Sequence, residues 1–249
     1  MRFTPLAAAA LVAAVSAPAP RAALGAAFYD EPAFVEPAGW TVGDAGSTYQ
    51  LWHEFADTDT APVGPDAGEW TASPAVATTP TFQITSPGFM PGPGRTYSFS
   101  TPYGAAATVG NVAPGAAGLG THVILQVATS LNPDLGGIVA GSVHVLDGDG
   151  DAITAGGEAI DALQATAFGA RPINSPFGPT TFAENIFEFF LPGYTGDFTL
   201  AWTQNVHAGI EAVRVDSYLT AEPLPITAVP EPASLTLLAA GVLLALRRR

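Results

Sequence analysis

Residues 121–129 read Thr-His-Val-Ile-Leu-Gln-Val-Ala-Thr, a run of strand length in which β-branched side chains are frequent. Segments of similar character, alternating or rich in aromatic residues, follow along the chain: 142–146, 185–191, 198–204 and 211–216. Less regular stretches precede them: 49–55, 79–84 and 95–100. Several short strands at this spacing predict an all-β fold, with an antiparallel β-sandwich or jelly-roll-like domain over residues 27–220.

Residues 157–168 allow a different interpretation. Their apolar positions fall at helical spacing, so a helix competes with a strand there. Elsewhere, 27 glycines and 23 prolines act as turn punctuation. The stretch 101–120, rich in Ala and Gly, and the stretch 60–80 are expected to be long loops.

The composition of the 249 residues excludes several classes of function. There is no cysteine, so disulfides, thiolate catalysis and cysteine-ligated metal sites are absent. Lys and Arg number 8 against 22 Asp and Glu, which gives a formal net charge of −14. So acidic a chain repels nucleic acid and attracts divalent cations. The positive mean hydropathy, +0.29, comes in large part from the two ends.

The N-terminus has the layout of a secretory signal peptide. Arg2 precedes an apolar run from Leu6 to Ala17, and small residues follow it. The run is shorter than the ~20 residues of a membrane-spanning helix. We therefore predict a signal peptide over residues 1–26, with a buried N-terminal helix as the alternative.

The C-terminus combines a short motif, an apolar stretch and a basic cluster. Pro230, Glu231 and Pro232 precede the apolar residues 233–246. As a helix this stretch rises about 21 Å, short of a hydrocarbon core about 30 Å thick. The chain then closes on Arg247, Arg248 and Arg249. By the positive-inside rule these arginines hold that end in the cytoplasm and leave the rest outside, as the signal peptide also predicts.

This tail resembles the PEP-CTERM sorting signal of Gram-negative bacteria. The resemblance covers residues 230–249, and residues 221–229 are expected to link the domain to the signal. It implies cleavage by an exosortase, a membrane protease of the transpeptidase type, and a transient inner-membrane intermediate. It also implies a protein of the cell surface or extracellular matrix of a bacterium that makes exopolysaccharide. An ordinary tail anchor is the alternative.

The segment Asp147-Gly148-Asp149-Gly150-Asp151 is a candidate calcium site. With Glu158, its acids fall at positions 1, 3, 5 and 12 of an EF-hand-like loop, so their carboxylates can converge on one cation. Position 6 is Ala152, where the pattern requires glycine. The alternative is a β-hairpin turn, for which Asp-Gly is typical, and the two interpretations are compatible.

A second group of acidic residues comes from the two ends of the expected domain. Asp30 and Glu31 near its start can meet Asp216 near its end, because the termini of jelly rolls often lie close together. Some carbohydrate-binding jelly rolls hold a structural calcium in that region. This spacing predicts a further, less specific calcium site.

Motifs for catalysis are scarce. His53-Glu54 begins like the helix of a zinc protease, but Asp57 stands where the second histidine belongs. There is no Gly-x-Ser-x-Gly elbow and no P-loop. The remaining histidines are scattered: His122, His144 and His207. We therefore expect no enzyme and no catalytic residue.

Aromatic side chains offer a surface on which sugar rings can stack. The candidates are Trp40, Trp52, Trp70, Trp202, Tyr49, Tyr97, Tyr103 and Tyr194. Trp202 lies beside Leu200 in an alternating segment and is expected in the core. Trp52 and Trp70 adjoin polar loops and are the better candidates for exposure.

These features together predict an exported, non-catalytic protein of the cell surface or extracellular matrix. Its expected partners are the export machinery and an exosortase-type protease, and calcium is the one candidate cofactor. A carbohydrate-binding module that engages exopolysaccharide is the alternative. A secreted hydrolase is the third, since two of the many acids can form the carboxylate pair that glycoside hydrolysis needs. Removal of both ends leaves Arg95, Arg171 and Arg214 as the only basic residues.

Overall fold

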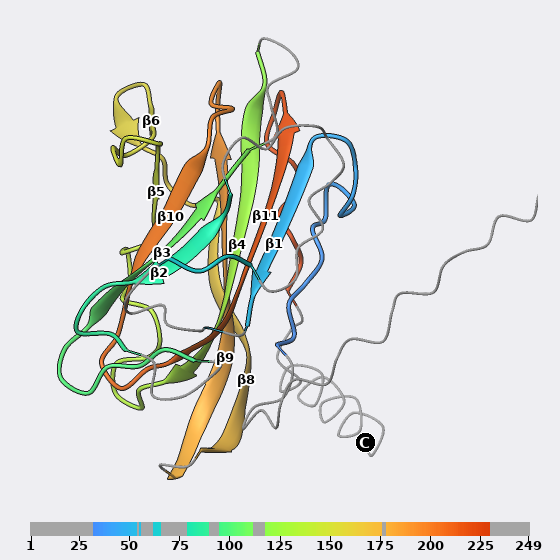
Figure 1. Cartoon of the computed structure of the whole chain (residues 1–249). Coiled ribbons are helices and arrows are strands. Elements are labelled where there is room, and N and C mark those ends of the chain that lie inside the picture. The colour runs from blue at the N-terminus through green and yellow to red at the C-terminus, as the bar shows by residue number, and fades with distance from the viewer. Residues whose placement is uncertain are drawn as a thin grey trace, which may run out of the picture.

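The structure is a computed structural model that describes residues 32–53, 55, 62–65, 79–89, 95–111, 118–175 and 178–229 (Figure 1). These residues form antiparallel β-sheets and contain no helix. Within them, accordingly, no helix has the length and apolar character needed to cross a membrane. The predicted signal peptide, residues 1–26, and sorting tail, residues 230–249, lie outside the described residues.

The larger sheet has five strands with β4 at its centre. Their order is β1 (Ser47–Trp52), β11 (Ile210–Thr220), β4 (Gly120–Leu131), β9 (Gly178–Leu191) and β8 (Gln164–Ser175). The register places Ile124 of β4 opposite both Asp216 of β11 and Glu188 of β9. Because alternate residues of a strand point to the same side, this register decides which side chains share a face.

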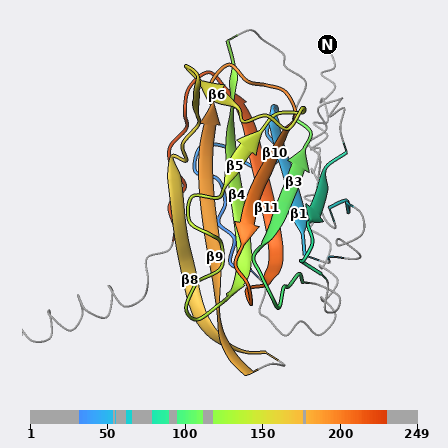
Figure 2. The ribbon, with the colours of Figure 1, turned by 90° about the vertical axis from the view of Figure 1, so that its left-hand side faces the viewer.

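The smaller sheet has four strands. Their order is β2 (Thr81–Ile84), β3 (Tyr103–Val109), β10 (Phe198–Gln204) and β5 (His144–Leu146). A separate small hairpin pairs β6 (Thr154–Ala155) with β7 (Glu158–Ala159). Figure 2 looks onto the smaller sheet and shows β10 and β3 in front of the larger one.

One hydrophobic core lies between the two sheets. Its buried members come from both of them and include Val123, Leu125, Val127, Phe189, Val213, Phe82, Phe198, Leu200 and Trp202. Burying one such side chain contributes about 1.5–3 kcal/mol, so this core is the main source of stability. We call the side of the larger sheet that faces it the inner face.

The central strand β4 is also buried on its other side. Every residue from Gly120 to Ser130 is buried, although strict alternation would expose half of them if the second side faced water. The side chains of His122, Ile124 and Gln126 point away from the core and are nonetheless shielded. Something other than the smaller sheet therefore covers this side of β4.

Most of the strands expected from the sequence are present. The segments 121–129, 185–191, 198–204 and 211–216 fall within β4, β9, β10 and β11, and β5 covers the second half of 142–146. Segments 49–55 and 79–84 largely coincide with β1 and β2. The all-β, antiparallel class is therefore confirmed.

Two local predictions and one alternative interpretation are wrong. Residues 101–120 are not one long loop, because Tyr103–Val109 forms β3 in the middle of the smaller sheet. Two of its inward residues, Ala105 and Ala107, are small and lie opposite the larger Trp202 and Leu200 of β10. Residues 157–168 contain β7 and the start of β8 instead of a helix. Residues 95–100 make isolated bridges rather than a strand.

Candidate functional site

The candidate site is the side of the larger sheet that points away from the core, here called the outer face. Its centre carries six polar or charged residues from three adjacent strands: His122 and Gln126 on β4, Arg214 and Asp216 on β11, and Glu184 and Glu188 on β9. All six are buried. Burial of so many polar groups is costly unless each finds a partner, so their contacts show what this face does.

The N-terminal segment, residues 32–46, covers one part of the outer face. Ala33 donates its backbone N–H to Glu184 Oε1 at 2.9 Å. Val35 donates its N–H to Gln126 Oε1 at 2.8 Å and accepts a bond from Gln126 Nε2 at 2.8 Å. The backbone of this segment is therefore held by two buried polar side chains, whereas the backbone of a strand is held by a neighbouring strand.

Arg214 ties the same segment to the centre of the sheet. Its two terminal nitrogens donate to the carboxylate of Glu36, each at 2.8 Å. Its Nε and Nη2 donate to Asp216 at 2.8 and 3.0 Å, and its guanidinium lies 4.8 Å from the ring centre of Tyr49. One cation therefore serves two carboxylates and an aromatic ring.

The charges in this cluster shift each other's pKa values. Burial raises the pKa of Asp216 to about 6, and the opposing charge of Arg214 limits the rise. Burial acts to lower the pKa of Arg214, but its bonds to Glu36 and Asp216 outweigh burial and raise it. Arg214 therefore stays charged, and acidification affects Asp216 first.

The C-terminal segment, residues 221–229, covers the neighbouring part of the outer face. Leu224 donates its N–H to His122 Nδ1 at 3.1 Å, and Thr227 donates its N–H to Glu188 Oε1 at 2.9 Å. Leu224 and Val229 also pack against a small apolar cluster of Trp40, Ile124, Phe168 and Ile186. The segment expected to be a linker thus lies bound to the sheet.

His122 and Glu188 form a buried pair beneath this segment. Because His122 Nδ1 accepts a hydrogen bond, the neutral ring carries its proton on Nε2, which lies 4.0 Å from Glu188 Oε2. Burial lowers the pKa of His122 to about 4. Burial raises the pKa of Glu188, which the bonds from Thr227 partly offset. Protonation of His122 at Nδ1 would set two donors against each other and weaken the contact with Leu224.

The two terminal segments also touch each other. Trp40 of the N-terminal segment lies on the sheet beside the C-terminal segment: its ring stacks on Tyr218 of β11 at 5.7 Å and meets the edge of His122 of β4 at 5.4 Å between ring centres. At Gly39, a Cβ atom would lie only 2.7 Å from Leu224 Cβ. Glycine at this position therefore lets the N-terminal segment and the C-terminal segment approach each other over the sheet.

The predicted calcium residues lie elsewhere, in a turn after β5. Asp147 Oδ1 accepts the N–H groups of Asp149 and Asp151, each at 3.0 Å, and Leu146 bridges to Ala152 as in a hairpin. Glu158 lies on β7. Among the described residues, no three or more His, Cys, Asp or Glu side chains are grouped so that they could hold a metal. Calcium binding at Asp147, Asp149, Asp151 and Glu158 stays a prediction.

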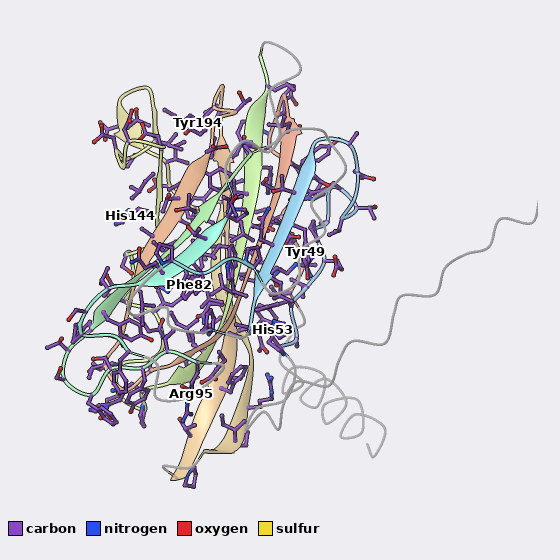
Figure 3. The ribbon with its side chains drawn as sticks, in the orientation of Figure 1. Tyr49, His53, Phe82, Arg95, His144 and Tyr194 are labelled. Atoms are coloured by element: carbon purple, nitrogen blue, oxygen red, sulfur yellow. The ribbon has the colours of Figure 1, made fainter. Side chains whose placement is uncertain are left out.

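The other sequence candidates are dispersed. Asp30 and Glu31 lie outside the described residues, as do Glu54, Asp57, Trp70 and the sorting residues Pro230, Glu231, Pro232, Arg247, Arg248 and Arg249. Asp216 does meet the N-terminal part of the chain, but through Arg214 and Glu36. His53 and His144 lie well apart in the molecule (Figure 3).

The aromatic candidates divide into buried and exposed groups. Trp40, Trp52, Trp202 and Tyr103 are buried, so Trp52 is not the exposed residue that the sequence favoured. An exposed aromatic cluster exists instead around Phe99, which is 56% exposed. Phe99 stacks on Phe89 at 5.4 Å and meets Tyr97 edge-on at 4.9 Å.

Sequence reasoning missed most of the outer-face residues. Glu184, Glu188 and Gln126 alternate with apolar residues, and this pattern is also typical of a sheet face exposed to water. The available signal was the apolar Ile124 and Ile186 between these polar outer-face residues, combined with terminal segments long enough to fold back. That signal indicates a sheet covered on both sides without naming the cover.

Comparison with known proteins identifies one feature of the chain. Residues 228–249 match the family model described as the PEP-CTERM protein-sorting motif, which confirms the resemblance seen in the sequence. No curated protein and no solved structure matches the chain. The motif implies an exported protein, directed to the cell surface and processed by an exosortase-type enzyme.

Proposed function

We propose that this chain is a non-catalytic protein of the cell surface or extracellular matrix, exported with the help of residues 1–26 and released through its C-terminal tail. The observation that carries the proposal is the sorting motif at residues 228–249. The domain contributes a stable body and an outer face that holds the segment leading into this motif. The buried charges described above are engaged in internal contacts, which supports a structural role.

The order of the strands supports the finer description as a jelly-roll-like β-sandwich. One sheet holds β1, β11, β4 and β9 as neighbours, and the other holds β3, β10 and β5. Apart from the hairpins β2–β3 and β8–β9, the strands of these two sheets change sheet from one to the next along the chain, as in a jelly roll. These two hairpins are the departures from a regular jelly roll.

The test of the proposal is processing of the full chain in a Gram-negative host that carries an exosortase. The mass of the exported protein should correspond to loss of residues 1–26 and of the tail. Replacing Pro230, Glu231 and Pro232 with alanine should leave the tail attached. Equal masses for both chains would overturn the proposal.

The exposed aromatic cluster favours a second candidate, binding of exopolysaccharide. Phe99, Phe89 and Tyr97 present ring faces and edges at the surface, and aromatic faces suit the C–H faces of sugar rings. Binding of the purified full chain to a glycan array, with and without calcium, tests this function. Phe99→Ala should abolish binding, whereas Leu135→Ala, at another exposed apolar residue, should not. A blank array for the unmodified chain would reject it.

A further inference from the structure

We propose that the C-terminal segment, residues 221–229, is a latch that must leave the outer face before the sorting tail can be cut. The inference rests on the proposed function, because it assigns a control point to the same processing reaction. It predicts that docking of this segment, and not the sequence of the motif alone, sets the rate of cleavage.

The latch and the sorting motif overlap in the chain. Thr227 is 2% exposed and gives its N–H to Glu188, and the matched motif begins at the next residue. Val229, inside the motif, packs against the apolar cluster of the outer face. Pro230 follows directly. The docked segment therefore holds the first residues of the signal against the body of the domain.

An enzyme that cuts this tail needs the same atoms. Extended peptides are recognised largely through their main-chain N–H and C=O groups, with pockets for alternate side chains. In the docked state the N–H of Thr227 is used by Glu188, and one side of Val229 faces the sheet. Docking and recognition by the enzyme therefore exclude each other.

The latch is built to open without unfolding the sheets. The backbone N–H groups of Leu224 and Thr227 bind side-chain acceptors of the outer face instead of forming a strand ladder. Ile226 is 53% exposed, so about half of its side chain faces water. His122 and Glu188 can bind water once the segment leaves. Opening therefore leaves no buried acceptor without a hydrogen-bond partner. Segments with few contacts open far more often than the whole domain unfolds.

The docked state also contains polar atoms without partners, which favours opening. Among the described residues, His122 Nε2 and Glu188 Oε2 are buried side-chain atoms without a hydrogen-bond partner. Burial of unsatisfied polar atoms is unfavourable, and departure of the latch exposes them to solvent. The balance between docked and released states is therefore close enough for single substitutions to shift it.

Two matched pairs of variants shift this balance in the full chain. Thr227→Pro removes the N–H that binds Glu188, whereas Thr227→Val keeps that N–H and removes only the hydroxyl. Gly39→Ala places a Cβ within 2.7 Å of Leu224, whereas Gly64→Ala adds a Cβ with no heavy atom within 4 Å. The Thr227→Pro variant changes the latch itself, and the Gly39→Ala variant changes the N-terminal segment beside it. The second member of each pair is its control.

The experiment measures docking and cleavage separately. Hydrogen exchange of residues 221–229 in purified full-length chains, kept intact by alanine at 230–232, reports docking. Pulse-chase labelling in the exosortase host, with the natural motif, reports cleavage. We expect Thr227→Pro and Gly39→Ala to speed both exchange and cleavage about 3-fold to 10-fold over Thr227→Val and Gly64→Ala.

The outcomes separate this inference from the proposed function. Faster exchange with an unchanged rate of cleavage overturns the latch and leaves the sorting function intact. Unchanged exchange in both variants also overturns the latch, since its contacts would then not hold the segment. Absence of cleavage in every chain, including the unmodified one, overturns the proposed function.

Discussion

The two faces of the larger sheet bury side chains by opposite means. The inner face packs apolar residues such as Leu125 and Phe189 against the smaller sheet. The outer face buries Arg214, Asp216 and Glu188 under two segments of irregular backbone. The inner face relies mainly on shape and volume, whereas the outer face relies on specific donors and acceptors. The comparison teaches that one sheet can both define a fold and bind the two segments that flank its strands in the chain.

The largest effect is expected at the inner face. Phe189→Ala removes a fully packed ring from the core and leaves a cavity, so it should lower the free energy of unfolding by about 4 kcal/mol. Urea denaturation measures this change. Leu135→Ala, at a residue that is 56% exposed, should change stability by less than about 0.5 kcal/mol. A comparable loss in both variants would contradict the assignment of the core.

The next largest effect is expected at the outer face, where replacing one member of an ion pair should cost more stability than replacing both. Arg214→Met leaves Asp216 buried without its counter-charge and should cost about 3 kcal/mol. Arg214→Met combined with Asp216→Leu removes both charges and should recover most of that loss. Glu36 is 71% exposed and turns to water in either case. Additive losses in the double variant, measured by urea denaturation, would show that the face does not depend on charge pairing.

The strands, but not the cover of the outer face, follow from local sequence. Alternation along 198–204 and the β-branched run at 121–129 predict β10 and β4 directly, because the apolar side chains in these segments are the ones that are buried. β3 is hidden because its middle is a run of alanine from Ala105 to Ala107, a residue with little preference for strands. The contacts of Glu188 and His122 depend on residues 39 and 102 positions away in sequence. No local pattern contains that information.

An effect of at most the same size is expected when pH changes the outer face. The pKa of His122 is about 4 in the folded chain and 6.5 when unfolded, so the unfolded state binds more protons between these values. Its contribution to stability is therefore lost as pH falls from 6.5 to 4, by up to about 3 kcal/mol. Asp216, with a raised pKa, and Glu188 act in the opposite direction.

Comparison with His122→Asn isolates the histidine from those two acids. Asparagine keeps an oxygen that can accept the N–H of Leu224 but does not titrate. The stability of the unmodified chain relative to this variant should fall as pH is lowered from 7 to 4. A difference that is independent of pH would show that His122 does not lie neutral beneath the C-terminal segment.

The smallest effect concerns the acidic turn, which lies outside both faces. If Asp147, Asp149, Asp151 and Glu158 bind calcium with millimolar affinity, a few millimolar calcium should raise Tm by about 2–4 °C. Asp149→Asn with Asp151→Asn should remove the response while the bonds to Asp147 Oδ1 keep the turn. Identical melting in chelator and in calcium would reject the site.

The docking of the C-terminal segment by separate side chains has a mechanical consequence. A pull applied beyond Val229 loads its contacts one at a time: first the packing of Val229, then the bond of Thr227 to Glu188, then that of Leu224 to His122. The segment therefore peels at low force instead of resisting in shear. The load then reaches β11, which is hydrogen-bonded to β1 on one side and β4 on the other. A domain anchored by its tail would thus yield by a short, reversible extension while its two sheets stay intact.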